Sequence, residues 1–285
     1  ALQLVGIQAV LDVMGVGGES STSGGFRTMS PAVSPRWLFA GPPRPGAPSL
    51  YCFAHAGGSV IEYIRWARDT PAAQLQGVQL PGRGSRYGEP MFASLKALVA
   101  AFLDEVPLGP EPFAFFGHSL GSLIAYEVTR ALRDAGRPLP YRLILSGYPA
   151  PHRRHVRATD PLHRLPDDEL IERVAKLHGG IPQEVLDSAE LRELIVGPLR
   201  DDYRVLETYT WREAEPLPVP ITLLGGSADH PREELDAWRE HTTEDLTIRQ
   251  FPGGHFYLRQ HPVPVLRALE EALGDVGARR ERTAR

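Results

Sequence analysis

Residues 117–121 read Gly-His-Ser-Leu-Gly, so that a serine lies two positions from a glycine on each side. This spacing is typical of a sharp turn from a strand into a helix, where the hydroxyl is exposed and small neighbours let the two elements approach. An apolar run at 113–116 precedes Ser119, and an amphipathic segment follows it. Ser119 is therefore the candidate nucleophile of an acyl-transfer reaction. The alternative is a glycine-rich turn that carries no chemistry.

A serine hydroxyl needs a base to take its proton, and the base needs a partner to orient it. Among ten histidines, His255 is favoured because it lies in a glycine-rich loop after the last predicted strand. Asp229 follows the strand predicted at 219–224, and the interval to His255 leaves room for one helix and one strand. Asp236 and Asp245 are rivals. Asp236 falls within a predicted helix, and Asp245 precedes a strand, at the end away from the site.

The oxyanion formed in acyl transfer needs two backbone N–H donors. Leu120, directly after the candidate nucleophile, is predicted to supply one of them. Residues 55–58 read His-Ala-Gly-Gly and are similar to the loop that supplies the other donor in lipases, which makes Ala56 the second candidate. A plain glycine turn is the alternative there. His118 is expected to support the geometry of the turn, and the remaining histidines are expected to take surface or packing roles.

Apolar runs that predict strands alternate with segments of helical periodicity along the chain. Strands are expected at 49–54, 74–80, 112–117, 141–146, 219–224 and 246–251, and helices at 59–68, 94–106, 120–135, 232–240 and 263–273. This alternation predicts an α/β fold, with a mostly parallel central sheet and helices on both faces. Residues 149–215 show helical patterns only and predict a lid over the carboxyl ends of the strands. With the serine turn, the pattern indicates the α/β-hydrolase fold.

The bulk composition limits the other function classes. A flexible tail is expected at 1–34 and one α/β-hydrolase domain at 35–285, a length that buries a substantial core. A formal net charge of -4 gives no basis for nucleic-acid binding. No apolar run reaches the ~20 residues that span a bilayer. Cys52 is the only cysteine, which excludes an internal disulfide and fits a reducing, cytoplasmic compartment.

Several spaced segments resemble the type II thioesterases that accompany polyketide synthases and non-ribosomal peptide synthetases. Residues 53–58 are similar to the family's F-P-H-A-G-G, with Ala54 in place of proline, and residues 199–203 are similar to its L-R-A-D-[FY], with Asp201 in place of alanine. Further matches lie at 79–83, 150–152, 165–167, 180–182, 207–209 and 253–256. The resemblance runs from about Trp37 to His261 and includes several segments of the predicted lid.

The resemblance implies an editing thioesterase, which hydrolyses acyl thioesters on the phosphopantetheine arm of an acyl carrier protein or peptidyl carrier protein. Ser119 would take the acyl group, His255 would act as base and then as acid, and Asp229 would hold His255. Ala56 and Leu120 would stabilise the oxyanion. Pantetheine belongs to the carrier protein, so no metal and no bound cofactor are expected. A monomer that binds neither nucleic acid nor membrane is expected.

Some alternatives stay open at this point. Apolar residues at helical spacing in 170–177 and 185–195 either pack on the core or line an acyl chamber. The basic segment 152–157 either guides docking of an acidic carrier protein or is a solvated loop. Competing functions are a general carboxylesterase, a cyclising thioesterase and a non-catalytic scaffold that binds carrier proteins. The tail at 1–34 is too short for the carrier domain that normally precedes a cyclising enzyme, and a complete triad argues against the scaffold.

Overall fold

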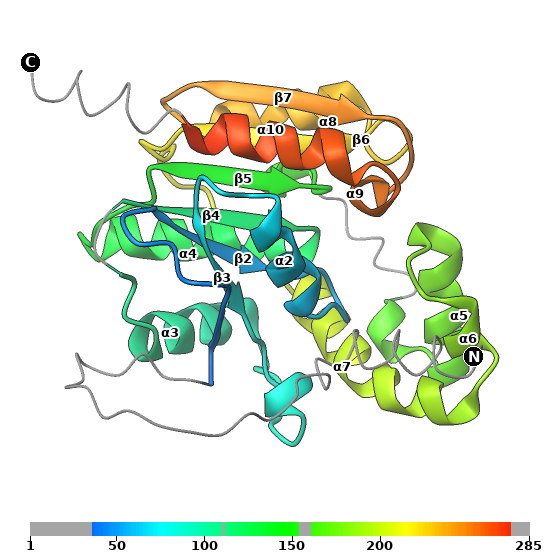
Figure 1. Ribbon diagram of the computed structural model, residues 1–285. Coiled ribbons are helices and arrows are strands. Elements are labelled where there is room, and N and C mark those ends of the chain that lie inside the picture. The colour runs from blue at the N-terminus through cyan, green and yellow to red at the C-terminus, as the bar shows by residue number, and fades with distance from the viewer. Residues whose placement is uncertain (1–35, 110–111, 154–160, 275–285) are drawn as a thin grey trace, which may run out of the picture.

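A seven-stranded sheet forms the centre of the molecule (Figure 1). The computed structural model describes residues 36–109, 112–153 and 161–274, so the tail expected at 1–34 lies outside the described residues. The strand order is β1-β3-β2-β4-β5-β6-β7. All adjacent strands are parallel except β1 and β3, which are antiparallel. The mostly parallel sheet expected from the alternation of strands and helices is thereby confirmed.

The elements follow the expected order along the chain. The strands are β1 Leu38–Ala40, β2 Ser49–Phe53, β3 Gln74–Val78, β4 Phe113–His118, β5 Arg142–Ser146, β6 Ile221–Gly226 and β7 Leu246–Phe251. The α-helices are α2 Ile61–Ile64, α3 Leu95–Glu105, α4 Leu120–Asp134, α5 Asp167–His178, α6 Gln183–Leu186, α7 Ala189–Glu207, α8 Arg232–Asp236, α9 Tyr257–Gln260 and α10 Pro262–Gly274. Short 3-10 helices lie at Arg65–Arg68, Gly84–Arg86, Pro151–Arg153, Leu162–Arg164 and Ala237–His241.

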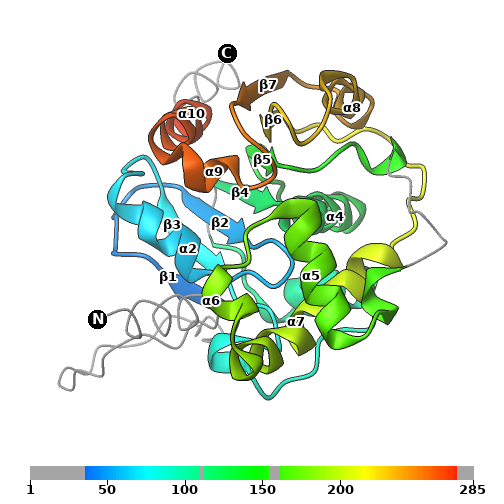
Figure 2. The same cartoon turned by 90° about the vertical axis from the view of Figure 1, so that its right-hand side faces the viewer.

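Helices cover both faces of the sheet, as Figure 2 shows. Helices α3, α4 and α8 pack on one face, and α2, α9 and α10 pack on the other. Strand β4 is buried along its whole length, which explains why its sequence is an uninterrupted apolar run. Cys52 in β2 is fully buried, and this burial raises the pKa of its thiol. No described helix is both long and apolar enough to cross a bilayer.

Two predicted helices differ from the expectation in the same way. The helix expected at 59–68 is the single turn α2 followed by the 3-10 helix Arg65–Arg68. The helix expected at 232–240 is α8 followed by the 3-10 helix Ala237–His241. Periodicity in a short window predicts a helical segment but does not separate α from 3-10 geometry, because the two differ by only 0.6 residue per turn.

The insertion between β5 and β6 forms the three helices α5, α6 and α7, here called the lid helices. They lie together beyond the carboxyl ends of the strands (Figures 1 and 2). Most of their buried apolar side chains form a third cluster beside the two that flank the sheet, while Val205 of α7 packs in one of those two. Within the described part of 149–215 there is no strand, as the sequence predicted. The lid helices are thus placed to enclose a ligand at the strand ends.

Candidate active site

Ser119 occupies the turn between β4 and α4 in a strained backbone conformation. Its φ of 54° and ψ of −117° make it the one non-glycine residue with positive φ among those described. Such strain costs of order 1–3 kcal/mol and persists where the surroundings fix it. Here the Ser119 N–H donates to the Ser146 carbonyl on the neighbouring strand at 2.8 Å. The strained turn predicted around the candidate nucleophile is present.

Gly117 and Gly121 allow the close approach that this turn requires. A Cβ at Gly117 would overlap the carbonyl oxygen of Gly121, and a Cβ at Gly121 would overlap the carbonyl oxygen of Phe53 in β2. Both obstacles are backbone atoms, which cannot rotate away. Glycine is therefore needed for steric reasons at both positions.

We expect Gly121→Ala to destabilise the protein by about 3 kcal/mol, because the added methyl group forces α4 away from β2. For a chain of this size the melting temperature should fall by roughly 5–10 °C in differential scanning calorimetry. Gly197→Ala is the matched control, because Gly197 is also helical, in α7, and a Cβ there meets nothing within 4 Å. An unchanged melting temperature for Gly121→Ala would contradict the close approach.

His255 and Asp229 form a hydrogen-bonded pair at the ends of β7 and β6. The His255 Nδ1 lies 2.9 Å from Asp229 Oδ2 and 3.1 Å from Oδ1. Both side chains are more than nine-tenths buried. Burial alone would raise the pKa of Asp229, but the hydrogen bond and charge of His255 hold that pKa below its usual value. The carboxylate stays ionised and orients the imidazole.

The two loops that carry this pair hold each other in place. The Ala228 N–H donates to the Gly253 carbonyl at 2.9 Å, and the Ser227 N–H donates to the Phe251 carbonyl at 2.8 Å. A Cβ at Gly226 would overlap the carbonyl oxygen of Gly254, so this approach also needs glycine. The close approach thus explains Gly226, and the positive φ of 108° explains Gly253.

The rival aspartates lie elsewhere. Asp236 is half exposed on α8 and pairs with Arg232 at 3.3 Å. The carbonyl of Asp245 accepts from the Ile221 N–H at the start of β6, the end of the sheet opposite to the site. Neither contacts His255, so the structure favours Asp229 as its partner.

The two predicted oxyanion donors come from different segments of the chain. Leu120 is the first residue of α4 and is fully buried. Ala56 lies in the loop after β2, where Gly57 takes a positive φ of 72°. The N–H of Ala56 makes no hydrogen bond to the described residues and is therefore available to a ligand. Ala56 lines the same cavity as Ser119 and His255.

That cavity has a volume of about 600 Å³ and lies between the strand ends and the lid helices. Val174, Val185 and Ile195 line it from the lid. By contrast, Leu170 and Ile171 are buried in the lid's own apolar cluster, and the Leu177 side chain is exposed. Some of the lid's apolar residues thus line the cavity and others pack within the lid, and the role of the cavity as an acyl chamber stays a prediction.

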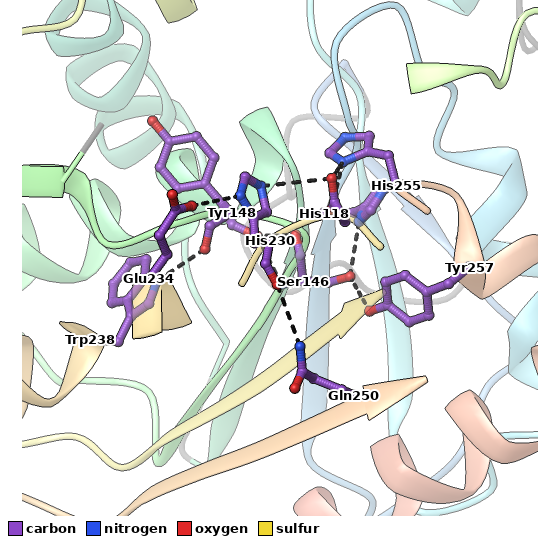
Figure 3. Close-up of polar contacts among 11 residues, drawn as sticks. His118, Ser146, Tyr148, His230, Glu234, Trp238, Gln250, His255 and Tyr257 are labelled. Atoms are coloured by element: carbon purple, nitrogen blue, oxygen red, sulfur yellow. Dashed lines mark hydrogen bonds and ion pairs between the residues drawn. The ribbon is translucent and has the colours of Figure 1, made fainter. Parts of the chain in front are cut away.

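His118 lies beneath the His255 ring at the start of a buried hydrogen-bonded chain (Figure 3). Its Nδ1 lies 2.9 Å from Ser146 Oγ, which lies 2.6 Å from the Tyr257 hydroxyl. Burial, aided by the charge of His255, holds the pKa of His118 well below its usual value. A neutral His118 supports the turn, as expected from the sequence, without repelling a protonated His255.

The lid also contacts the candidate base, which the sequence did not reveal. The ring of His178, the last residue of α5, lies 4.6 Å from that of His255, and burial lowers the pKa of His178 to about 4. The Gly180 carbonyl accepts from Arg259 Nη1 at 3.0 Å, and that guanidinium stacks on Phe256. Gly180, where a Cβ would overlap the Phe256 ring, is the residue that could have signalled this contact.

Asp229, His230 and His255 are the one grouping of possible metal ligands among the described residues. The His230 nitrogen that faces the other two residues is Nε2, 3.8 Å from Asp229 Oδ1. The His230 ring is held through Nδ1, 3.0 Å from Glu234 (Figure 3). His255 Nδ1 is bonded to Asp229 at 2.9 Å. The grouping is therefore explained as a His–Asp pair with a neighbouring imidazole.

The basic segment 152–157 is described only in its first two residues. His152 Nδ1 lies 2.7 Å from His241 Nε2, and Arg153 lies 3.9 Å from Glu240. The other residues of the segment lie outside the described part of the chain, so the docking role stays a prediction.

The fold and the site together define a class of protein. A serine hydrolase with the α/β-hydrolase fold has a mostly parallel sheet, with a strained serine after one strand and an aspartate and a histidine after later strands. This protein has the serine after β4, the aspartate after β6 and the histidine after β7. The model of the thioesterase domain matches residues 48–273, and the chain belongs to the thioesterase family.

Individual relatives agree with this membership. The gramicidin S biosynthesis protein GrsT of Aneurinibacillus migulanus is 35% identical over 73% of this chain and 82% of its own length. Thioesterase PikA5 of Streptomyces venezuelae is 34% identical over 78% of this chain and 80% of its own. The structure of the type II thioesterase BorB from the borrelidin biosynthetic cluster superposes with a TM-score of 0.74, at 36% identity, over 84% of this chain and 98% of that one. The predicted fold, enzyme class and family resemblance are confirmed.

Proposed function

We propose that this protein is an editing thioesterase that removes acyl groups from the phosphopantetheine arms of acyl or peptidyl carrier proteins in polyketide or non-ribosomal peptide biosynthesis. The observation that carries the proposal is that Ser119 and His255 both line a largely apolar cavity covered by the lid helices. The pathways named for the relatives, such as gramicidin S and borrelidin biosynthesis, support the substrate class.

In the first half of the proposed reaction the acyl group moves from sulfur to the enzyme. His255 takes the hydroxyl proton while Ser119 Oγ attacks the thioester carbonyl carbon, whose π electrons move to oxygen. The N–H groups of Ala56 and Leu120 stabilise this oxyanion. When it collapses the C–S bond breaks, and protonated His255 gives its proton to the departing sulfur. The products are an acyl-Ser119 ester and the free pantetheine thiol.

In the second half water takes the place of the hydroxyl. His255 removes a proton from water, which attacks the acyl-Ser119 carbonyl and again forms an oxyanion between the N–H groups of Ala56 and Leu120. Collapse breaks the ester C–O bond, and His255 returns the proton to Ser119 Oγ. The free carboxylic acid leaves and the enzyme is regenerated. Asp229 holds the imidazole in the required tautomer throughout and stabilises its protonated form.

The surrounding structure fits this chemistry. We propose that the insertion predicted at 149–215 acts as a lid on the single domain at 35–285, since its apolar side chains line the cavity beside Ser119. Such a wall binds acyl chains by burial and without directional polar contacts, which suits a set of differing acyl groups. We further propose a cytoplasmic monomer, consistent with a single, buried cysteine.

A comparison of three substrates that share one acyl group tests the proposal. We expect kcat/KM for the acyl-carrier thioester to exceed that for the acyl-pantetheine thioester by about 10-fold or more, because protein contacts add binding energy. Both should exceed the corresponding oxygen ester. The carboxylic acid released would be followed by mass spectrometry. A preference for the oxygen ester would favour a general carboxylesterase, and equal rates with and without the carrier would contradict the carrier-protein substrate.

A further inference from the structure

A buried ion pair joins the lid to the loop that carries the second oxyanion donor. Asp202, on α7, is completely buried, and Arg83, in the loop after β3, is only 4% exposed. Arg83 Nη1 and Nη2 each donate to one carboxylate oxygen of Asp202 at 2.6 Å, a bidentate arrangement. The Gly57 N–H donates to Oδ2 of the same carboxylate at 2.7 Å. One side chain of the lid therefore holds two separate loops.

The bond from Gly57 acts on the loop that carries the neighbouring donor. The Gly57 N–H shares a planar peptide with the Ala56 carbonyl, so Asp202 fixes the peptide that follows the donor. The Ala56 N–H belongs to the preceding peptide, whose His55 carbonyl accepts from the Gly58 N–H at 2.9 Å. Gly58 is held in turn, because Arg83 Nη1 also donates to its carbonyl at 3.3 Å. The Ala56 side chain packs against the lid cluster as well as against the main core. The two residues that follow Ala56 are thus held by this ion pair, and the Ala56 side chain is held by the lid and the core.

The pairing with Arg83 has an electrostatic consequence for the site. A lone buried carboxylate one residue from an oxyanion donor would repel the negative charge that develops on the substrate. A guanidinium bound through both of its terminal nitrogens compensates that charge while leaving the carboxylate able to accept from Gly57. A buried ion pair adds little to stability relative to apolar side chains of similar volume, so stability alone does not account for this one.

We propose that Asp202 is a positioning residue for the oxyanion hole, which fixes the orientation of the Ala56 N–H through its bond to Gly57. This inference rests on the proposed function, in which Ala56 supplies one of the two donors. Because Asp202 belongs to α7, the hole is complete only while this lid helix is seated on the domain. Hydrolysis is thereby coupled to lid position, and an enzyme with a displaced α7 binds acyl thioesters but turns them over slowly.

Asp202→Asn tests the proposal, because the amide NH2 replaces one carboxylate oxygen and then faces N–H donors, either Arg83 Nη2 or the pair Arg83 Nη1 and Gly57. The variant therefore loses the negative charge and the bidentate contact that hold this side chain against the loop. We expect kcat for an acyl-pantetheine thioester to fall about 10- to 100-fold with KM nearly unchanged, since a misplaced donor weakens the transition state and not the bound substrate. In a trifluoromethyl ketone analogue the Ser119 Oγ adds to the carbonyl carbon, and the carbonyl oxygen becomes an oxyanion. The affinity for this analogue should fall by a similar factor. A thioether analogue, which has no carbonyl, should bind Asp202→Asn with the same affinity as it binds the unaltered protein.

Glu207→Gln is the matched control on the same helix. Glu207 accepts from the backbone N–H groups of Leu162 and His163 at 2.8 and 3.0 Å, so it tethers the lid without touching the loop of Ala56. The Glu207→Gln variant should have a lower melting temperature, while its kcat and its affinity for the trifluoromethyl ketone stay within about twofold of those of the unaltered protein. If Asp202→Asn behaves in the same way, Asp202 is only structural and the proposal is overturned.

Arg83→Lys provides a second variant if Asp202→Asn does not fold. It keeps the positive charge but loses the bidentate contact, so kcat and trifluoromethyl ketone affinity should again fall together, by a smaller factor. Unchanged values would overturn the proposal. Failure of the proposed function has a different signature, because the unaltered protein would then show no thioesterase activity that depends on Ser119.

Discussion

Ser119→Ala is expected to lower kcat for thioester hydrolysis by about 10⁶-fold, because no other group can form the acyl-enzyme. Substrate should still bind, since the cavity wall is otherwise unchanged. Intact-protein mass spectrometry after brief mixing with substrate should show an acyl adduct on the unaltered protein and none on the variant.

Ser227→Ala is the matched control for that experiment. Ser227 is exposed on the loop that carries Asp229, and only its backbone N–H is bonded, to the Phe251 carbonyl. This variant should form the adduct and turn over at the normal rate. An adduct on Ser119→Ala, or full activity of that variant, would contradict the role of Ser119 as nucleophile.

Asp229→Asn is expected to lower kcat by about 10⁴-fold at neutral pH, although it changes the size of the side chain very little. The amide can donate to His255 Nδ1 and so place the proton on Nε2, where the ring cannot accept a proton from Ser119. Asp236→Asn is the control, since that rival carboxylate is half exposed and does not contact His255. Equal losses in both variants would contradict the assignment of Asp229.

The stability of the Asp229→Asn variant should differ from that of the unaltered protein in a pH-dependent way. The pKa of Asp229 in the folded protein lies below its ordinary value of 3.8, so its carboxylate stabilises the fold above that pH. This contribution is lost as the pH falls from about 3.8 through the folded value. Denaturant unfolding should therefore show a difference between the two proteins at neutral pH that shrinks in this acidic window.

The strands and the serine turn were predictable because their signals are local. Strands β2, β4, β5 and β6 contain apolar runs, β3 and β7 alternate apolar and polar residues, and Ser119 is marked by glycines two positions away. Strand β1 was not predicted, because it is only three residues long and pairs with β3 through contacts such as Leu38 with Val78, far apart in the sequence. Short pairings of this kind depend on the partner strand and leave little pattern in their own residues.

The candidate site shows the same division between local and distant signals. The order of Ser119, Asp229 and His255 along the chain, each after a strand, predicted a shared site. In the structure His255 pairs with Asp229, and Ser119 and His255 line one cavity. The contact of Arg83 with Asp202 was not predictable from spacing, because 119 positions separate the two residues and neither lies near the other in any motif. Residues 199–203 were noted only as part of a family pattern, and the structure shows what Asp202 contacts.

The buried position of Cys52 has a practical consequence for studying this enzyme. Since no other cysteine occurs in the chain and this thiol is shielded with a raised pKa, reagents that detect free thiols should report the pantetheine released and not the protein. For the same reason, cysteines introduced at one exposed position on α5 and another on α10 would be the only reactive sites for a pair of fluorophores. The separation between the dyes would then follow the lid in solution while the enzyme turns over.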